Sequence, residues 1–212
     1  MRMCKICFQS IPLKPLIDYV TPPLLCTRCY HKLEWHHRIE LIGGTPVESF
    51  FDYGEVFQER IHQFKTLHDI EIGPTFLHQH LIYLRLKYHR YTLVMAPSHE
   101  EDIQSRGFHH LESIYGQLKL PLIHPFFKNQ PYRQASQSRS QRHQIEQVIT
   151  LKPGFIFKDR LCIVDDVMTS GETMRVMKTK IPVHFLKTLR IMVLARVKPV
   201  KKPIQTNLIM VK

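Results

Sequence analysis

The sequence lacks any long hydrophobic run. Its longest uninterrupted apolar stretches, such as IMVLA at 191–195, are far shorter than the ~20 residues with which a helix spans a bilayer. The first ten residues, MRMCKICFQS, contain no apolar segment of the kind found in a secretory signal. With 43% apolar and 23% charged residues, the composition is typical of a globular chain. We therefore expect a soluble, cytoplasmic protein without membrane insertion.

Acidic residues are few compared with basic ones. The chain has 18 Asp and Glu against 30 Lys and Arg, which gives a net charge of +12. The excess is uneven, because residues 121–160 carry +5 and residues 174–212 hold ten basic residues and no acidic one. Such a distribution favours a polyanionic partner, such as nucleic acid or a phosphorylated metabolite. The alternative is a basic surface with no specific partner.

Cysteine is also rare, with five residues, four of which form two Cys-x-x-Cys pairs 18 residues apart. The paired residues are Cys4, Cys7, Cys26 and Cys29. Two residues between thiols let a tight turn present both sulfurs to one tetrahedral ion, and the separation of the pairs suits a four-thiolate zinc site. Four thiolates leave no open position, so the expected zinc is structural. Disulfides are the alternative, which a reducing cytosol disfavours. Cys162 lies in an apolar run and is interpreted as a core residue.

Histidine is abundant, with 14 residues, but none lies in a convincing set of metal ligands. The three that follow the cysteine pairs have no role there, because four thiolates already complete a site. Four others are interpreted as exposed polar positions: His62, His68, His78 and His80.

The rest of the chain predicts alternating strands and helices. We expect strands at 47–53, 92–97, 160–166 and 188–197, and helices at 30–40, 55–69, 75–89, 109–119 and 170–180. Alternation of this kind indicates an α/β fold with a mainly parallel sheet flanked by helices. We expect a small zinc-binding domain over residues 1–44 and an α/β domain with a basic C-terminal tail over 45–212.

The most informative segment is LCIVDDVMTSGETM at 161–174. A buried strand ends in Asp165 and Asp166, and a polar turn then leads into a helix. Ligands of open α/β sheets bind beyond the carboxyl ends of strands, and a helix N-terminus with free amides can surround a phosphate. Adjacent carboxylates suit ribose hydroxyls, directly or through magnesium. The residues expected to hold the phosphate are Thr169, Ser170, Gly171 and Thr173. An ordinary strand–turn–helix with a capping hydroxyl is the alternative.

This segment resembles the signature of the type I phosphoribosyltransferases. Together with the four-cysteine head, the chain resembles the ComF family of competence-associated proteins over nearly its whole length. Further similarities are Phe64-Lys65 at the end of a helix, Arg106-Gly107-Phe108, and a Gln-rich loop with Gln134 and Arg142. The chain departs from the family pattern at Ser98, His109, Ile145 and Glu172.

The resemblance implies a site for phosphoribosyl pyrophosphate (PRPP) with magnesium. Asp165 and Asp166 would bind the ribose, and the phosphate turn would bind the 5-phosphate. The residues that the resemblance implies for the pyrophosphate are Pro97, Ser98, His99 and Arg106. No residue is identified as catalytic.

The family role implied by the resemblance is DNA uptake in natural transformation, with single-stranded DNA and a competence helicase or other uptake protein as partners. Lys and Arg would neutralise DNA phosphates, and the candidate contacts are Arg133, Arg139, Arg142, Lys198, Lys201 and Lys202. Two alternatives remain open: an active phosphoribosyltransferase that acts on a nucleobase-like acceptor, and a non-catalytic scaffold with a vestigial site.

Overall fold

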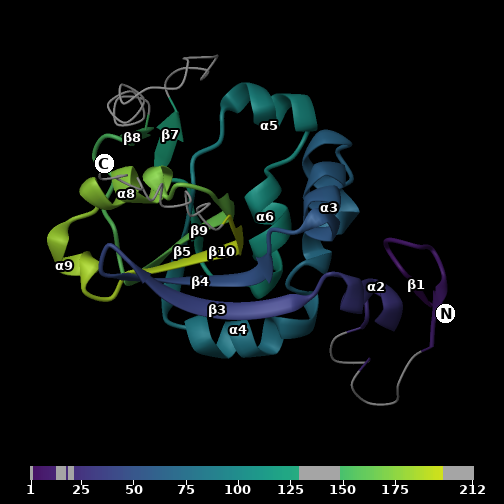
Figure 1. The fold of residues 1–212 in the computed structure, drawn as a ribbon. Coiled ribbons are helices and arrows are strands. Elements are labelled where there is room, and N and C mark those ends of the chain that lie inside the picture. Colours follow the sequence, from purple (N-terminus) through teal and green to yellow (C-terminus); the bar gives the residue numbers. More distant parts are fainter. Residues whose placement is uncertain (1, 13–17, 19–21, 129–148, 198–212) are drawn as a thin grey trace, which may run out of the picture.

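A six-stranded sheet forms the centre of the molecule (Figure 1). The computed structural model describes residues 2–12, 18, 22–128 and 149–197. The strand order is β3-β4-β10-β9-β5-β6. The bounds are β3 Trp35–Ile42, β4 Thr45–Asp52, β5 Tyr91–Met95, β6 Leu122–Ile123, β9 Arg160–Met168 and β10 Arg190–Arg196. Only the β3–β4 pair is antiparallel among these neighbours. The expected α/β class with a mainly parallel sheet is confirmed.

The central strands are buried because helices cover the sheet (Figure 1). Leu161, Cys162, Ile163 and Val164 of β9 are all inaccessible to solvent, as near-continuous apolar strands of parallel sheets usually are. Cys162 is thus a core residue, as expected. The α-helices are α2 Thr27–Lys32, α3 Glu55–Thr66, α4 Leu81–Tyr88, α5 Glu100–Arg106, α6 His110–Tyr115, α8 Glu172–Thr179 and α9 Val183–Leu186. None of the helices in the described ranges has the length and apolar character needed to cross a bilayer.

Short elements complete the described part of the chain. Two small antiparallel sheets pair β1 (Arg2–Met3) with β2 (Ser10–Ile11), and β7 (Phe126–Lys128) with β8 (Ile149–Leu151). Three 3₁₀ helices are η1 Ile70–Thr75, η2 His78–His80 and η3 Gly116–Leu118. The expected helix at 75–89 is therefore broken, and its α-helical part begins at Leu81. At Gly73 an added Cβ would lie 2.2 Å from Ser113 Oγ, so this turn packs too closely for any larger residue.

The expected helix at 30–40 is wrong. Helix α2 ends at Lys32, and residues 35–42 form the edge strand β3. Gly43 and Gly44 both have positive φ, 54° and 74°, which is the conformation of a two-residue hairpin turn. This turn lets β3 fold back on β4, with Ile42 opposite Thr45. The division expected at residue 44 therefore falls inside a hairpin, and the sheet includes a strand from the N-terminal side of it.

The N-terminal segment is joined to the sheet by aromatic and polar contacts. His80 stacks on Trp35 with ring centroids 3.4 Å apart, and its Nε2 lies 3.2 Å from the hydroxyl of Tyr30. His78 Nε2 lies 2.7 Å from the carbonyl oxygen of Pro22. The interpretation of His78 and His80 as exposed positions is therefore wrong, because both are half-buried in this junction.

Candidate functional site

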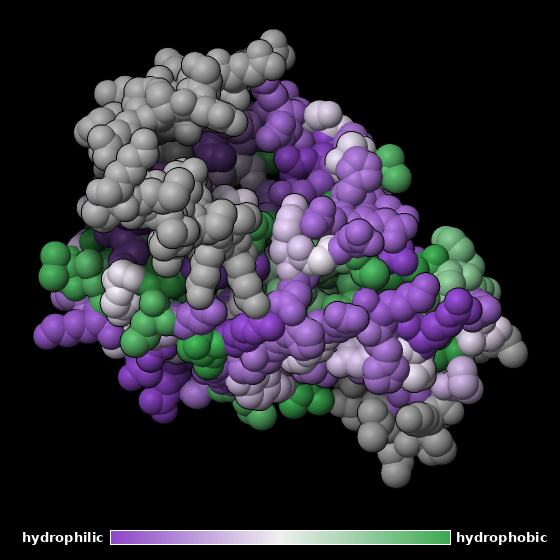
Figure 2. Space-filling model, viewed as in Figure 1, coloured by the Kyte–Doolittle hydropathy of each residue, from purple (hydrophilic) through white to green (hydrophobic). Residues whose placement is uncertain are grey.

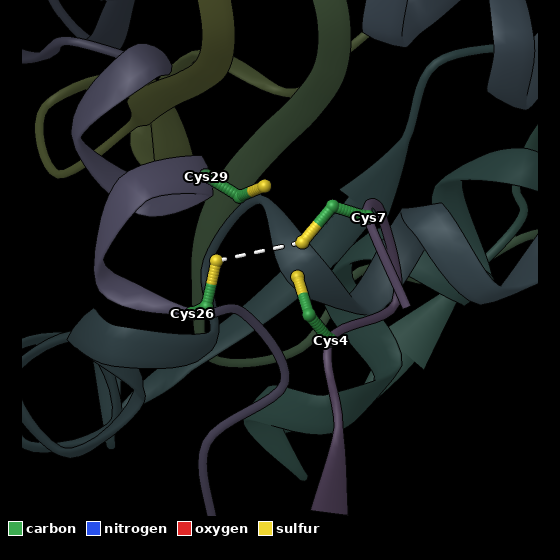
Figure 3. Close-up of side chains that lie close together, drawn as sticks. All are labelled: Cys4, Cys7, Cys26 and Cys29. Atoms are coloured by element: carbon green, nitrogen blue, oxygen red, sulfur yellow. Dashed lines mark hydrogen bonds between the residues drawn. The ribbon is translucent and has the colours of Figure 1, made fainter. Parts of the chain in front are cut away.

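The four paired cysteines come together at the N-terminal end of the chain (Figure 3). Cys4 follows β1, Cys26 precedes α2 and Cys29 lies in its first turn. The four Sγ atoms lie within 4.8 Å of one another. The Sγ atoms of Cys7 and Cys26 are 3.6 Å apart, which is far too long for a disulfide bond of about 2.05 Å. It is close to the spacing of about 3.8 Å that two sulfurs adopt at 2.3 Å from a tetrahedral zinc ion.

The charge states of the thiols also suit a cation. Burial raises the pKa of Cys4, but hydrogen bonds from the backbone amides of Cys26, Cys7 and Ile6 outweigh it and hold this pKa well below the ordinary value. Burial and the neighbouring thiols raise the pKa of Cys29. The protein alone thus favours a thiolate at one position and opposes it at another. A divalent ion would stabilise all four as thiolates, so the residues fit the expected metal.

A second group of functional residues lies where β9 meets the carboxyl edge of the sheet. Strands β5 and β9 are parallel, with Met95 opposite Val164, so the loop after β5 begins beside the two aspartates. The amide of Ala96 donates to the carbonyl of Val164 at 2.9 Å. The structure therefore brings together Asp165, Asp166 and the segment that contains Pro97, Ser98 and His99. In Figure 2 the surface over α3 and α5 is largely hydrophilic.

Asp166 is held inside the protein. Its side chain forms an ion pair with Lys65 of α3, and its Oδ2 lies 3.0 Å from Nε2 of His110 on α6. Asp166 and His110 are each only 4% exposed. Burial raises the pKa of Asp166, but the nearby His110 and the charge of Lys65 outweigh it and hold this pKa below the usual range. Asp166 is therefore an internal carboxylate with its negative charge already compensated.

The protonation state of His110 follows from its second neighbour. Arg106 Nη1 donates to Nδ1 of His110 at 2.9 Å, and an arginine can only donate. The proton of the neutral ring is therefore on Nε2, facing Asp166. Burial lowers the pKa of His110, which agrees with a neutral ring. Arg106, expected beside a pyrophosphate, thus contacts His110 and approaches Asp102 at 3.5 Å.

Asp165 differs from its neighbour. Its side chain is half-buried, and its Oδ1 accepts a hydrogen bond from the amide of Asp166 at 2.9 Å. Its carbonyl accepts one from the hydroxyl of Tyr115 at 2.7 Å. Burial and then the charge of Asp166 raise the pKa of Asp165. Adding a cation or a hydroxyl donor at Asp165 would relieve this repulsion, so Asp165 is the carboxylate suited to a ligand.

The turn after β9 leads directly into α8. Thr169 and Ser170 are exposed, and Gly171 caps the helix with a φ of 76°. Ser170 Oγ accepts from the amide of Glu172 at 3.4 Å. Glu172, a departure from the family pattern, is paired with Arg175 at 2.6 Å. The charge of Glu172 is thereby partly neutralised beside the turn. Half-buried Thr173 lies in the first turn of the helix.

The loop at 97–99 has an acidic continuation. Pro97 is buried, while Ser98 and His99 are half-buried. The next three residues, Glu100, Glu101 and Asp102, form the first turn of α5. Carboxylates at this point attract cations and repel a free pyrophosphate. A cation bound between these carboxylates and a pyrophosphate would offset the repulsion.

Sequence reasoning missed the partners of the aspartates. Lys65 was noted only for its resemblance to a family motif, and His110 was not singled out. Their contacts join positions far apart in the sequence, so no local pattern signals them. A further group that sequence reasoning missed is His109, Glu112 and His124, whose ligand atoms lie within 4.8 Å of one another. The six candidate DNA contacts, Arg133, Arg139, Arg142, Lys198, Lys201 and Lys202, lie outside the described residues.

No protein-family model matches the chain. A similar curated protein is competence protein ComFC of Streptococcus pneumoniae (strain ATCC BAA-255 / R6), 22% identical over 138 residues. The match covers 64% of this chain and 61% of that protein, so the chain spans about three fifths of the relative's length.

Solved structures with some similarity are adenine phosphoribosyltransferases. The Trypanosoma brucei enzyme is 11% identical, with a TM-score of 0.34 and coverage of 79% of this chain and 94% of that one. The Leishmania tarentolae enzyme is 13% identical, with a TM-score of 0.29 and coverage of 79% and 87%. The Leishmania donovani enzyme is 13% identical, with a TM-score of 0.30 and coverage of 79% of each chain. The curated similarity, the four-cysteine cluster and the mainly parallel α/β sheet together support a ComF-like protein.

Proposed function

We propose that this protein is a cytoplasmic competence factor that binds a phosphoribosyl ligand with magnesium and handles single-stranded DNA during uptake. The observation that carries the proposal is the arrangement at the end of β9. There the half-buried Asp165, three residues before the end of β9, is followed by an exposed hydroxyl turn and the N-terminus of α8. This order of groups suits a ribose followed by its 5-phosphate. The similarity to a competence protein supports the cellular role.

Each part of the proposed ligand has a counterpart among these residues. The hydroxyls of Thr169, Ser170 and Thr173 and the amides around Gly171 would bind the 5-phosphate. Asp165 would accept from a ribose hydroxyl or bind magnesium. Magnesium would supply positive charge between the pyrophosphate and the carboxylates that follow Ser98 and His99. Asp166 would act from inside, by fixing the position of β9 through Lys65 and His110.

The test is calorimetric titration of PRPP with magnesium. We expect binding to the wild type and its loss in Asp165→Asn, because this substitution removes the ligand-facing charge. Asp159→Asn, an exposed carboxylate before the same strand, is the matched control and should bind as the wild type does. Equal heats for the wild type and Asp165→Asn would rule out this site for the ligand.

Transferase activity is the competing proposal. Two carboxylates that both face a ribose would each accept one hydroxyl, but Asp166 is already engaged by Lys65 and His110. We therefore propose a binding site with little transfer activity. Pyrophosphate release from PRPP in the presence of a nucleobase, abolished in Asp165→Asn, would favour the transferase instead.

The proposed DNA contacts rest on charge. Segments 129–148 and 198–212 contain seven basic residues and one acidic residue, so they carry +6 of the net +12. Each phosphate contact adds to the salt dependence of DNA affinity. Replacement of Lys198, Lys201 and Lys202 by alanine should weaken binding to a single-stranded oligonucleotide and flatten its salt dependence, measured by fluorescence anisotropy. An unchanged salt slope would exclude the tail as a contact.

We propose that the four paired cysteines hold one structural zinc ion. It contributes no open position for a substrate, so its role is to order residues 2–34, which have little apolar core of their own. We keep as a proposal the division of the chain into a small zinc-binding domain and an α/β domain.

A further inference from the structure

His109, Glu112 and His124 form a cluster at the edge of the sheet. His109 directly precedes α6, Glu112 lies in the first turn of that helix, and His124 follows the edge strand β6. The two imidazole rings meet edge to face with centroids 4.5 Å apart. All three side chains line a pocket of about 270 Å³, which also includes Ser98 and Lys152. The cluster is therefore accessible to a ligand from solvent and is separate from both the cysteines and Asp165.

Two ring nitrogens in this cluster have no hydrogen-bond partner within the described part of the chain. They are Nδ1 of His109 and Nε2 of His124, and both atoms are buried. Nε2 of His124 lies 2.7 Å from Oε1 of Glu112, but the two atoms do not meet in hydrogen-bond geometry. Buried polar atoms normally find partners, and each exception needs an explanation. One ligand atom from each of the three side chains lies within 4.8 Å of the other two.

The charges of the cluster suit a cation. Glu112 contributes a negative charge, and Glu100 lines the same pocket. Lys152 is the basic residue on the pocket wall and would face an anionic ligand.

We propose that His109, Glu112 and His124 bind a divalent transition-metal ion. A donor set of two imidazoles and one carboxylate binds Zn²⁺ and neighbouring transition metals in preference to Mg²⁺ and Ca²⁺. Metal bonds of about 2.1 Å would place tetrahedral ligands about 3.4 Å apart, so atoms within 4.8 Å of one another need only small side-chain rotations. A further ligand, such as an oxygen of a water molecule or a phosphate, would come from the pocket that the three side chains share with Ser98.

The first test is the zinc content of the full-length protein after dialysis against Zn²⁺. We expect two ions per chain in the wild type, one at the cysteines and one at this cluster. The double variant His109→Gln/His124→Gln should retain one. His89→Gln, an exposed histidine outside the cluster, should retain two and controls for adventitious binding to surface imidazoles. The same zinc content in the wild type and in the double variant would overturn the proposal, whether or not the cysteines bind an ion.

A second test does not depend on buried substitutions. The wild-type protein, with zinc at its cysteines, is titrated with Co²⁺ and followed by visible absorption. We expect one equivalent to give the ligand-field bands of nitrogen and oxygen coordination, without thiolate charge-transfer bands. Glu112→Gln, whose side chain is 52% exposed and should not disturb folding, should weaken this signal. Absence of the bands, or a signal unchanged in Glu112→Gln, would refute the site, whatever the outcome for PRPP.

Discussion

At the scale of single residues, the pair Asp165–Asp166 shows how adjacent carboxylates acquire different roles. Asp166 contacts α3 and α6, where Lys65 and His110 compensate its charge. Asp165 is nevertheless close by, because its carboxylate, that of Asp166 and the ring of His110 have ligand atoms within 4.8 Å of one another. The side chain of Asp165 accepts a hydrogen bond from the amide of Asp166, and burial and the charge of Asp166 raise its pKa. The sequence pattern predicts two equivalent ligand-binding carboxylates, whereas the structure gives the two side chains different surroundings.

The ion pair of Asp166 gives a prediction about stability. Lys65→Met should lower the free energy of unfolding by about 1–3 kcal/mol, because it leaves a buried carboxylate with less compensation. The Lys65 side chain is 34% exposed, which places the cost toward the lower end. Urea denaturation measures the change. The double variant Lys65→Met/Asp166→Asn should recover part of the loss, and simple additivity of the two single variants would contradict the pairing.

His80 gives a prediction about pH. Burial, and then the proximity of His37, lowers the pKa of His80 from 6.5 to about 4. Between these two pKa values the unfolded chain binds more protons at this position than the folded one. The contribution of His80 to the free energy of unfolding is therefore fully present above about pH 6.5 and is lost as the pH falls toward 4. His80→Phe keeps a ring against Trp35 but cannot titrate, and should flatten the decline of stability between pH 7 and 5. Exposed His62→Gln should leave the decline unchanged, and an equally steep decline in His80→Phe would refute the assignment.

At the scale of elements, the β3–β4 hairpin marks the limit of sequence reasoning. The strand 47–53, the helix at 55–69 and the strand 160–166 each carry a strong local pattern and are confirmed within a few residues. Residues 35–42 carry an ambiguous one, because Trp35, Ile39 and Ile42 suit either a helix or an edge strand. Pairing with β4 decides the outcome. This interaction depends on the turn at Gly43–Gly44, which was interpreted as a domain boundary.

The backbone conformation of the Gly43–Gly44 turn can be tested by a glycine-to-alanine substitution. An added Cβ at Gly44 would meet nothing within 4 Å, but the φ of +74° is strained for any other residue. Gly44→Ala should therefore cost about 1–2 kcal/mol through the backbone alone. Gly116 also has free space, with an ordinary φ of −59°, so Gly116→Ala should be neutral or slightly stabilising. Thermal denaturation compares the two, and equal melting temperatures for the variants would contradict the hairpin geometry.

At the scale of the whole molecule, we expect a bound metal to stabilise the cysteine segment, while the sheet and its helices stay folded without it. Most of the buried apolar residues come from the sheet and its helices, whereas the cysteine segment contributes few, among them Ile11, Leu25 and Leu33. Chelation should therefore expose residues 2–34 to limited proteolysis while the sheet, including β3, stays protected. Mass spectrometry of the fragments locates the cleavage sites. Digestion of the core at the same rate as the N-terminal segment would show that the two parts unfold together.

The same scale explains which parts of the sites the sequence predicts. The four cysteines are readable because their spacing alone defines the geometry. Asp165 and the turn after it are readable because one strand and one helix position them. Lys65, His110 and the His109–Glu112–His124 group depend on how α3, α6 and β6 meet in space. Sequence patterns are local, so they do not contain this information.

Only two residues separate α2, which ends at Lys32, from β3, which begins at Trp35. The cysteine segment therefore has only a short connection to the sheet, and the contacts of Tyr30 with His80 and of Pro22 with His78 hold it against the rest of the protein. A partner protein that binds this segment would therefore bind it in a fixed orientation relative to the sheet. A force applied to the cysteine segment would therefore be transmitted directly to the edge strand β3.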